Sequence, residues 1–295
     1  IVHKVSAKEP VNDIERKMLT AGGSFGGAKP KALIEIAGEQ WVIKFFNNEP
    51  IDVPLIEHAS MTLAKFAGIQ VAETQVIRLP GDHALAVRRY DRNGLQRIHC
   101  ISAGTALRAQ TVAGQEPDLG YPSLAQLLRR AGVSEDDQDL LDMQELFRRM
   151  VFNILIDNTD DHEKNHELMV VSPAAQGQYR LAPAYDVLTT NSGQGHQEFT
   201  VGADGRDSTL SNAMSQCESF GYTQEQAADQ VMRVIKVVDG WRKHFKDCGV
   251  SEADLNSLAE RIDGALLLGE RQAFNPADYA TPARRLRRRG PFAKE

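Results

Sequence analysis

The most informative stretch of the sequence reads Asn158-Thr159-Asp160-Asp161-His162-Glu163-Lys164-Asn165-His166. It is the densest polar cluster in the chain. It follows an apolar segment at residues 139–156 whose large hydrophobic side chains recur at helical spacing, and it precedes two short β-rich runs at 168–171 and 179–182. Loops held between rigid elements often carry functional groups. We therefore expect the functional site to be built around this helix, loop and hairpin.

Asp160 and Asn165 have the D-x-x-x-x-N spacing of a phosphotransfer catalytic loop, in which the aspartate accepts the substrate hydroxyl proton and the asparagine holds a metal ion. Asp186 follows the hairpin and could bind the same Mg²⁺, because magnesium prefers one or two carboxylates plus phosphate oxygens. Each of these residues alone would fit a solvated loop. Their occurrence together and in this order favours a phosphotransfer site. The catalytic candidates are Asp160, His162 and Lys164, and the metal candidates are Asn165 and Asp186.

A glycine-rich segment at residues 22–27 precedes a predicted β-hairpin at 32–46 whose second strand ends in Val42-Ile43-Lys44. This order resembles the glycine-rich loop and the lysine strand of kinases. Glycines let backbone N–H groups approach phosphates, and Lys44 would add a point charge on the nucleotide. The next predicted helix, 54–68, offers Glu57 to hold that lysine. The candidate ATP-binding residues of the loop are Ser24, Phe25, Gly26, Gly27 and Ala28.

The pattern along the chain predicts an α+β fold of two lobes. Strand-like runs at 71–79 and 83–89 complete a small β-rich lobe, and the Asp-Arg-Asn-Gly sequence near residues 90–95 interrupts the pattern. The remainder is predicted to be mainly helical, with one late helix running from a capping box at Thr223 and Gln226 to Trp241 and another from Ser251 to Leu266. We therefore expect an N-lobe at 1–92 and a C-lobe at 93–295.

Two other motifs overlap the same segments. Residues 22–26 match the G-x-S-x-G serine-hydrolase elbow, but that turn needs a strand before it and a helix after it, and the order here is the reverse. His162 and His166 match H-E-x-x-H, which binds zinc from one face of a helix. This short motif can recur by chance, the copy here runs into a β-rich segment, and a zinc peptidase would leave Lys44 and Asp186 without a role. Neither motif is favoured.

Composition limits the remaining classes of function. The formal net charge is −6, from 34 Lys and Arg against 40 Asp and Glu, which disfavours direct nucleic-acid binding through a broad basic surface. The three cysteines are widely spaced and predict neither disulfides nor a zinc site, so a reducing cytoplasmic setting is expected. No apolar stretch approaches the length of about 20 residues that a spanning helix needs. We expect no membrane association.

The sequence resembles the HipA-like toxin kinases of bacterial toxin–antitoxin systems. The matching pieces occur in family order across much of the chain, at residues 24–32, 43–45, 89–92, 153–165 and 184–187. The resemblance implies a bilobal kinase-like fold, an ATP- and Mg²⁺-dependent serine/threonine-protein kinase, a protein substrate such as an aminoacyl-tRNA synthetase, and a DNA-binding antitoxin as partner. Longer family members carry a further N-terminal subdomain, so a compact or truncated form is expected.

The resemblance also assigns residue roles. It implies that Asp160 is the base, that Lys44 contacts phosphate, and that Arg88, Tyr90 and Asp91 lie at the hinge against adenine and ribose. It further implies that Ser24 is autophosphorylated. The likeness to eukaryotic kinases is one of spacing only, because Asp186 is followed by Val-Leu and no His-Arg precedes Asp160. A non-catalytic scaffold for an antitoxin and a small-molecule phosphotransferase remain the alternatives.

Overall fold

A computed structural model describes residues 30–46, 49–94, 96–112, 114–172, 178–190 and 192–280. The predicted hairpin is present as β1 (Lys31–Ile36) and β2 (Glu39–Phe45), which pair antiparallel so that Lys31 lies opposite Lys44. Ala37 and Gly38 turn the chain with positive φ angles of 52° and 82°, and glycine adopts such angles without steric cost. The hairpin lies at one edge of a four-stranded sheet of order β1-β2-β4-β3.

The other two strands of this sheet are β3 (Thr74–Leu79) and β4 (Asp82–Arg88), close to their predicted bounds. Helix α3 (Val53–Phe66) connects the two hairpins. The Asp52 carboxylate accepts a hydrogen bond from the Leu55 backbone N–H at 3.2 Å, and a proline occupies the first turn, where its missing N–H costs nothing.

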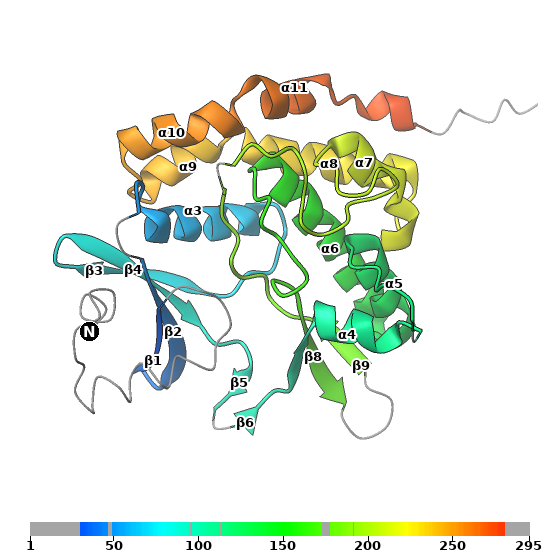
Figure 1. The fold of residues 1–295 in the computed structure, drawn as a ribbon, viewed down its shortest axis with the longest axis horizontal. Helices are drawn as coiled ribbons and strands as arrows, with labels where there is room; N and C mark the ends of the chain where they lie inside the picture. Colours follow the sequence, from blue (N-terminus) through cyan, green and yellow to red (C-terminus); the bar gives the residue numbers. More distant parts are fainter. Residues whose placement is uncertain are drawn as a thin grey trace, which may run out of the picture.

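Helix α3 lies between the small sheet and the C-terminal helices (Figure 1), and it contacts β3, β4 and α9 (Trp241–Asp247). Ile56 and Met61 of α3 belong to one continuous hydrophobic core with Val231 and Phe245 of the helical part. The far face of the sheet has a separate small cluster of Trp41, Ile43, Ala84 and Ala86. The helix that carries Glu57 is therefore fixed from both sides.

After β4 the chain forms the short hairpin β5 (Arg92–Asn93) and β6 (Gln96–Arg97), at the place where the lobes were predicted to join. It then enters a three-stranded sheet of order β7-β8-β9, made of β7 (Cys100–Ser102), β8 (Glu167–Ser172) and β9 (Gln178–Leu181). The β8-β9 hairpin was predicted from the sequence. Strand β7 and helix α4 (Ala103–Gln110) were not.

The helical part contains α5 (Tyr121–Ala131), α6 (Gln138–Leu155), α7 (Leu210–Ser215), α8 (Gln224–Val238), α9 (Trp241–Asp247), α10 (Glu252–Ile262) and α11 (Ala265–Ala273). The capping box of Thr223 and Gln226 starts α8 as predicted. Two predicted extents were wrong. The chain breaks at Asp239-Gly240, so Trp241 begins α9, and Leu266 belongs to α11, after a break at Gly264. The predicted α+β fold, with a small β-rich part and a larger helical part, is confirmed.

Candidate active site

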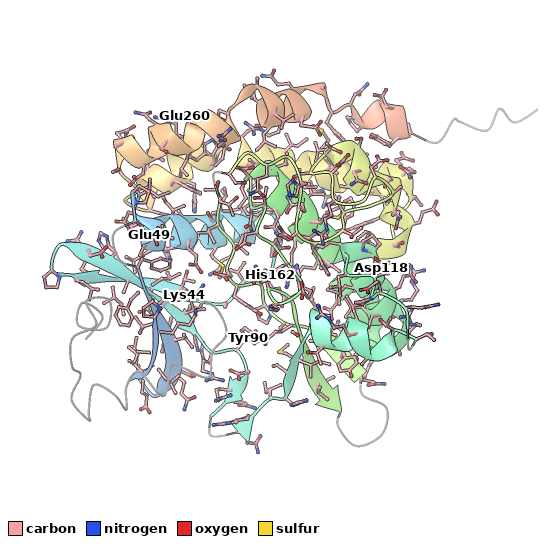
Figure 2. The ribbon with its side chains drawn as sticks, in the orientation of Figure 1. Lys44, Glu49, Tyr90, Asp118, His162 and Glu260 are labelled. Carbon is pink, nitrogen blue, oxygen red and sulfur yellow. The ribbon has the colours of Figure 1, made fainter. Side chains whose placement is uncertain are left out.

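Lys44 forms the centre of the candidate site (Figure 2). Side chains alternate along β2, so Trp41 and Ile43 face the small cluster while Lys44 points to the opposite face, toward α3. Its Nζ atom lies 2.5 Å from Glu57 Oε1 and 2.7 Å from Asp186 Oδ1. Three side chains that are far apart in sequence, from β2, α3 and the segment after β9, therefore meet at one ammonium group.

The charges of this cluster are set by burial and by one another. Burial alone would lower the pKa of Lys44, but the two carboxylates outweigh it and raise that pKa. Burial would raise the pKa of Asp186, but the Lys44 ammonium beside it lowers that pKa instead. Lys31, opposite Lys44 in the sheet, adds a second cation near the two carboxylates, and the half-exposed Asp186 side chain offers the oxygen ligands that a divalent cation prefers.

Asp186 is held in place through the backbone just before it. The Ala72 N–H donates to the Ala184 carbonyl at 2.9 Å, and the Ala184 N–H donates to the Gln70 carbonyl at 2.8 Å. These bonds join the segment after α3 to the segment after β9. Asp186 itself has a φ of 59°, a left-handed conformation that is uncommon for a residue with a side chain and that is often found at functional sites.

The loop at 157–166 follows directly from the end of α6. Asp157 also has a positive φ, 56°, and turns the chain out of the helix. Its carbonyl accepts a hydrogen bond from the Thr190 N–H at 3.0 Å, and its carboxylate accepts one from the Gly193 N–H at 3.1 Å. The start of the loop is thereby bonded to the segment that follows Asp186.

The two adjacent aspartates, of which the motif spacing favoured Asp160, have different environments in the structure. Asp160 is exposed, whereas Asp161 is buried and accepts hydrogen bonds from the Tyr121 hydroxyl and from His166 Nε2, the latter at 2.8 Å. Burial would raise the pKa of Asp161, but His166 and the Tyr121 hydroxyl lower it. Asp161 therefore holds the loop, and Asp160 is the carboxylate open to a substrate.

A buried polar network extends from Asp161 to the preceding helix. The Asn153 Nδ2 group donates to the Tyr121 hydroxyl at 3.2 Å, and the Asn158 Nδ2 group donates to Asn153 Oδ1 at 3.1 Å. Networks of this kind rigidify a site when every member has a partner. Tyr121 was not predicted as a site residue, because no sequence motif indicates that α5 packs beside the loop.

Asn165 lies next to Asp160 in space as well as in the motif. Its Nδ2 group donates to the Asp160 carbonyl at 3.3 Å, so the side-chain oxygen is left for a cation. Asn165 and Asp186 thus offer the oxygen ligands that Mg²⁺ prefers. Lys164 is exposed, and its carbonyl accepts a hydrogen bond from the Tyr185 hydroxyl at 2.6 Å, one residue before Asp186.

The H-E-x-x-H segment does not have the geometry that a zinc motif needs. Residues 162–166 form a turn rather than a helix, and the His166 ring bonds to Asp161. No group of three or more His, Cys, Asp or Glu side chains with metal-site geometry occurs within residues 30–280 where the chain is described. The buried Nδ1 atoms of His162 and His166 both have no hydrogen-bond partner in the same part of the chain, but only His166 is anchored to a carboxylate through its Nε2 atom.

Of the predicted hinge residues, Arg88 ends β4, whereas Tyr90 and Asp91 follow that strand, between the two parts of the fold. Tyr90 donates from its hydroxyl to Glu167 Oε2 at 2.7 Å and stacks on Tyr185. The Asp91 carboxylate accepts hydrogen bonds from the side chains of Arg89 and Arg92. Arg88 pairs with Glu39 of β2 and with Glu73, just before β3. The assignment of Arg88, Tyr90 and Asp91 to adenine and ribose remains a prediction.

The glycine-rich segment lies outside the described residues, and so do the predicted ATP-binding residues Ser24, Phe25, Gly26, Gly27 and Ala28. The described part of the site therefore consists of Lys44 and Glu57 from the β-rich part, and of the residues of 157–166 and Asp186 from the helical part. This set has the order and the Lys–Glu pairing of a phosphotransfer site.

The family model of the HipA-like C-terminal domain matches residues 23–241, which is most of the chain. This chain belongs to the HipA-like family. The match begins in the glycine-rich segment and includes every candidate residue of the site. Two curated relatives are "Putative kinase Y4dM" of Sinorhizobium fredii, 30% identical over 170 residues, and a "Putative kinase" of Haemophilus influenzae, 23% identical over 193 residues.

The two alignments cover 53% and 58% of this chain but only 39% and 53% of those relatives. The chain thus spans about half or less of their length. Among solved structures, HipA of Shewanella oneidensis, determined in complex with HipB and its operator DNA, aligns with a TM-score of 0.64 at 18% identity, over 85% of this chain and 65% of that one. The proinflammatory kinase CtkA of Helicobacter pylori aligns with a TM-score of 0.60 at 12% identity, over 85% of this chain and 95% of that one.

Both structural likenesses concern the fold, and both neighbours have kinase-like folds. The predicted family membership is confirmed. Among the helices of the described residues, none combines the length and apolar character that crossing a bilayer requires.

Proposed function

We propose that this HipA-like chain is an ATP- and Mg²⁺-dependent serine/threonine-protein kinase. The observation that carries the proposal is the position of Lys44, whose Nζ atom contacts Glu57 at 2.5 Å and Asp186 at 2.7 Å. Kinases need such a lysine–glutamate ion pair next to the metal-binding aspartate for phosphate transfer. The names of the curated relatives and the fold of the structural neighbours support the same reading.

The residues take the following roles in this proposal. Lys44 would hold the phosphates of ATP, and Asn165 with Asp186 would hold Mg²⁺, which neutralises phosphate charge when bound. The exposed Asp160 would accept the proton from the substrate hydroxyl as that oxygen bonds to the γ-phosphorus and ADP departs. Asp161 and Tyr121 would keep the loop rigid, which favours a fixed position of Asp160.

We further propose that the protein is the toxin of a toxin–antitoxin pair, with a DNA-binding antitoxin as partner and a translation-related protein such as an aminoacyl-tRNA synthetase as substrate. The support is family membership and the Shewanella oneidensis neighbour, which was determined with HipB and operator DNA. Ser24 would be the autophosphorylation site.

The test is incubation with γ-labelled ATP and Mg²⁺, alone and with cell extract, using wild type, Asp160→Asn and the control Asp229→Asn. Asp229 is an exposed residue of α8, so its variant has the same charge change away from the site. Label on protein serine or threonine with wild type and the control, but not with Asp160→Asn, is the expected result. Label only on a small molecule would show a metabolite phosphotransferase, and no transfer would show a scaffold.

A further inference from the structure

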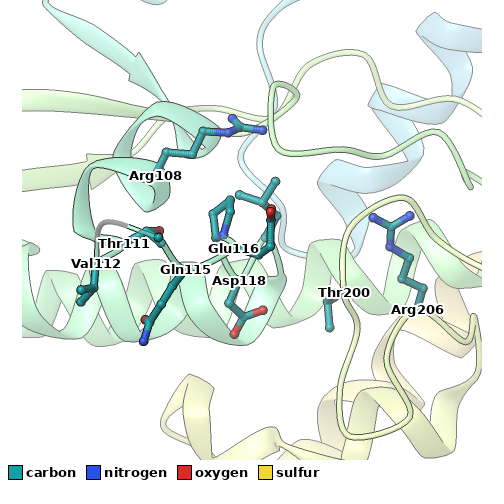
Figure 3. Close-up of a pocket in the computed structure, with 11 residues that line it drawn as sticks. Arg108, Thr111, Val112, Gln115, Glu116, Asp118, Thr200 and Arg206 are labelled. Carbon is teal, nitrogen blue, oxygen red and sulfur yellow. The ribbon is translucent and has the colours of Figure 1, made fainter.

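A pocket of about 630 Å³ lies in the helical part, between the segment joining α4 to α5 and the segment at residues 200–206 (Figure 3). Its lining is polar and charged, and includes Arg108, Thr111, Glu116, Asp118, Thr200 and Arg206. The two segments are joined at its base, because the Tyr121 N–H donates to the Thr200 carbonyl at 2.9 Å and the Thr200 N–H donates to the Leu119 carbonyl at 3.1 Å. The volume is within the range of ligand pockets.

This pocket adjoins the loop that carries Asp160. On one side, Arg108 Nη2 lies 3.0 Å from Glu163 Oε1, and the Gly104 N–H donates to the Glu163 carbonyl at 3.1 Å. A Cβ atom at Gly104 would lie 2.4 Å from the Glu163 side chain, so this close approach requires glycine. On the other side, the Glu198 N–H donates to the Thr159 carbonyl at 3.2 Å. Both walls are therefore bonded to residues that flank Asp160.

The charges around the pocket do not balance. Arg108 is paired with Glu163, and Arg206 is paired with Glu198 at 3.3 Å. Glu116 and Asp118 are exposed, and neither has a basic partner in the part of the chain that the structure describes. Asp118 accepts a hydrogen bond from the Ser123 hydroxyl, which does not neutralise it. The lining carries two arginines and two carboxylates, and both arginines pair with glutamates outside the lining, so the unpaired charges are the two carboxylates of the segment between α4 and α5.

We propose that this pocket binds the polypeptide segment that carries the phosphorylated hydroxyl, and that it selects a Lys or Arg side chain near that hydroxyl through Glu116 and Asp118. The inference rests on the proposed kinase function. A segment bound in the pocket would run past Arg108, whose ion-pair partner Glu163 lies three residues from Asp160 in the same loop. A cationic side chain would offset the unpaired negative charge, which is the usual basis of electrostatic selection at an interface.

The test compares serine peptides that differ only in basic, neutral or acidic residues flanking the serine. Binding is measured by fluorescence anisotropy of labelled peptides and transfer by labelled ATP, so that one readout does not depend on catalysis. The variant is Glu116→Gln with Asp118→Asn, which removes both charges and keeps an acceptor for Ser123. The control is Asp229→Asn with Glu260→Gln, exposed residues of α8 and α10, and Figure 2 shows Glu260 far from Asp118.

The expected result is that wild type and the control prefer the basic to the neutral peptide about three- to tenfold, as one or two partly exposed ion pairs would provide, and that the variant loses this preference. Transfer without any preference for basic peptides, a preference for acidic ones, or an unchanged preference in the variant would overturn the pocket assignment and leave the kinase function standing. Charge-dependent binding of the basic peptide without transfer would instead overturn the kinase function alone. If the protein neither binds the peptides nor transfers phosphate to them, the pocket assignment is overturned.

Discussion

Lys44 Nζ lies 2.5 Å from the carboxylate of Glu57, a residue of the helix packed between the small sheet and the C-terminal helices. The ion pair therefore depends on two packing surfaces. One is the sheet that carries Lys44, and the other is the contact of α3 with α9, which includes a hydrogen bond of 2.9 Å between Thr62 Oγ1 and His244 Nε2. A lysine held in this way needs little reorganisation to meet phosphate.

Replacement of Glu57 by glutamine should leave the fold intact and reduce phosphate transfer by about 100-fold, because Lys44 loses the charge that fixes its position. Transfer from labelled ATP to protein measures the effect. The control is Glu35→Gln, since Glu35 is an exposed residue of β1, in the sheet that carries Lys44, and lies opposite Gln40. Similar activity in the two variants would show that the Lys44–Glu57 pair has no part in transfer.

Asp186→Asn should weaken nucleotide binding mainly when Mg²⁺ is present, because an amide is a poorer magnesium ligand than a carboxylate. Titration of a fluorescent ATP analogue with Mg²⁺ and with EDTA separates the two conditions. We expect Mg²⁺ to increase the affinity of wild type for the ATP analogue and to increase that of the variant much less. An equal loss of affinity in both conditions would argue against a metal-binding role for Asp186.

Local sequence signals predicted those parts of the fold in which neighbours along the chain determine the structure. The β-hairpin within residues 32–46, the capping box at Thr223 and the helix start at Ser251 are all present. Short elements such as α4 and α7 were missed, because six to eight residues contain too little periodicity. The helix break at Gly240 was missed because apolar spacing continues across it.

The parts of the site that form from residues close together in sequence were also predictable. The spacing of Asp160 and Asn165 can be read from the chain, whereas the burial of Asp161 depends on Tyr121, which lies 40 residues away in sequence. The order of the motifs placed Lys44 and Asp186 at the same site, but the direct contact of these two residues, 142 apart in sequence, was not predicted. Tertiary contacts that no motif encodes, such as Tyr185 with the Lys164 carbonyl, could not be predicted.

Tyr121→Phe tests whether the buried network stabilises the protein. The variant keeps the ring contacts with Phe199 and His166 but removes the hydroxyl that Asp161 accepts from. Leaving a buried carboxylate short of a donor should lower the free energy of unfolding by about 1–3 kcal/mol. Urea unfolding measures this, with Tyr279→Phe as the control, since no hydrogen bond of the Tyr279 hydroxyl occurs in the described chain. Equal stability of the two variants would mean that the hydroxyl contributes nothing.

Ser24 should be phosphorylated in active protein and unmodified in the Asp160→Asn variant. A phosphate in the glycine-rich segment adds about −1.5 to −2 charges where ATP phosphates are expected to bind, and so should reduce nucleotide affinity. Mass spectrometry of both preparations locates the phosphate. A preparation that phosphorylates other proteins while Ser24 stays unmodified would exclude this autoregulation and leave the kinase proposal intact.

The central claim is most directly tested by measuring transfer and nucleotide binding side by side for wild type and Asp160→Asn. A base acts on the transferring step and contributes little to holding ATP, so transfer should fall by about 10²- to 10⁴-fold. The dissociation constant for Mg²⁺–ATP should stay close to that of wild type. Near-normal turnover in the variant would contradict the assignment of Asp160, and with it the proposal that this loop performs phosphate transfer.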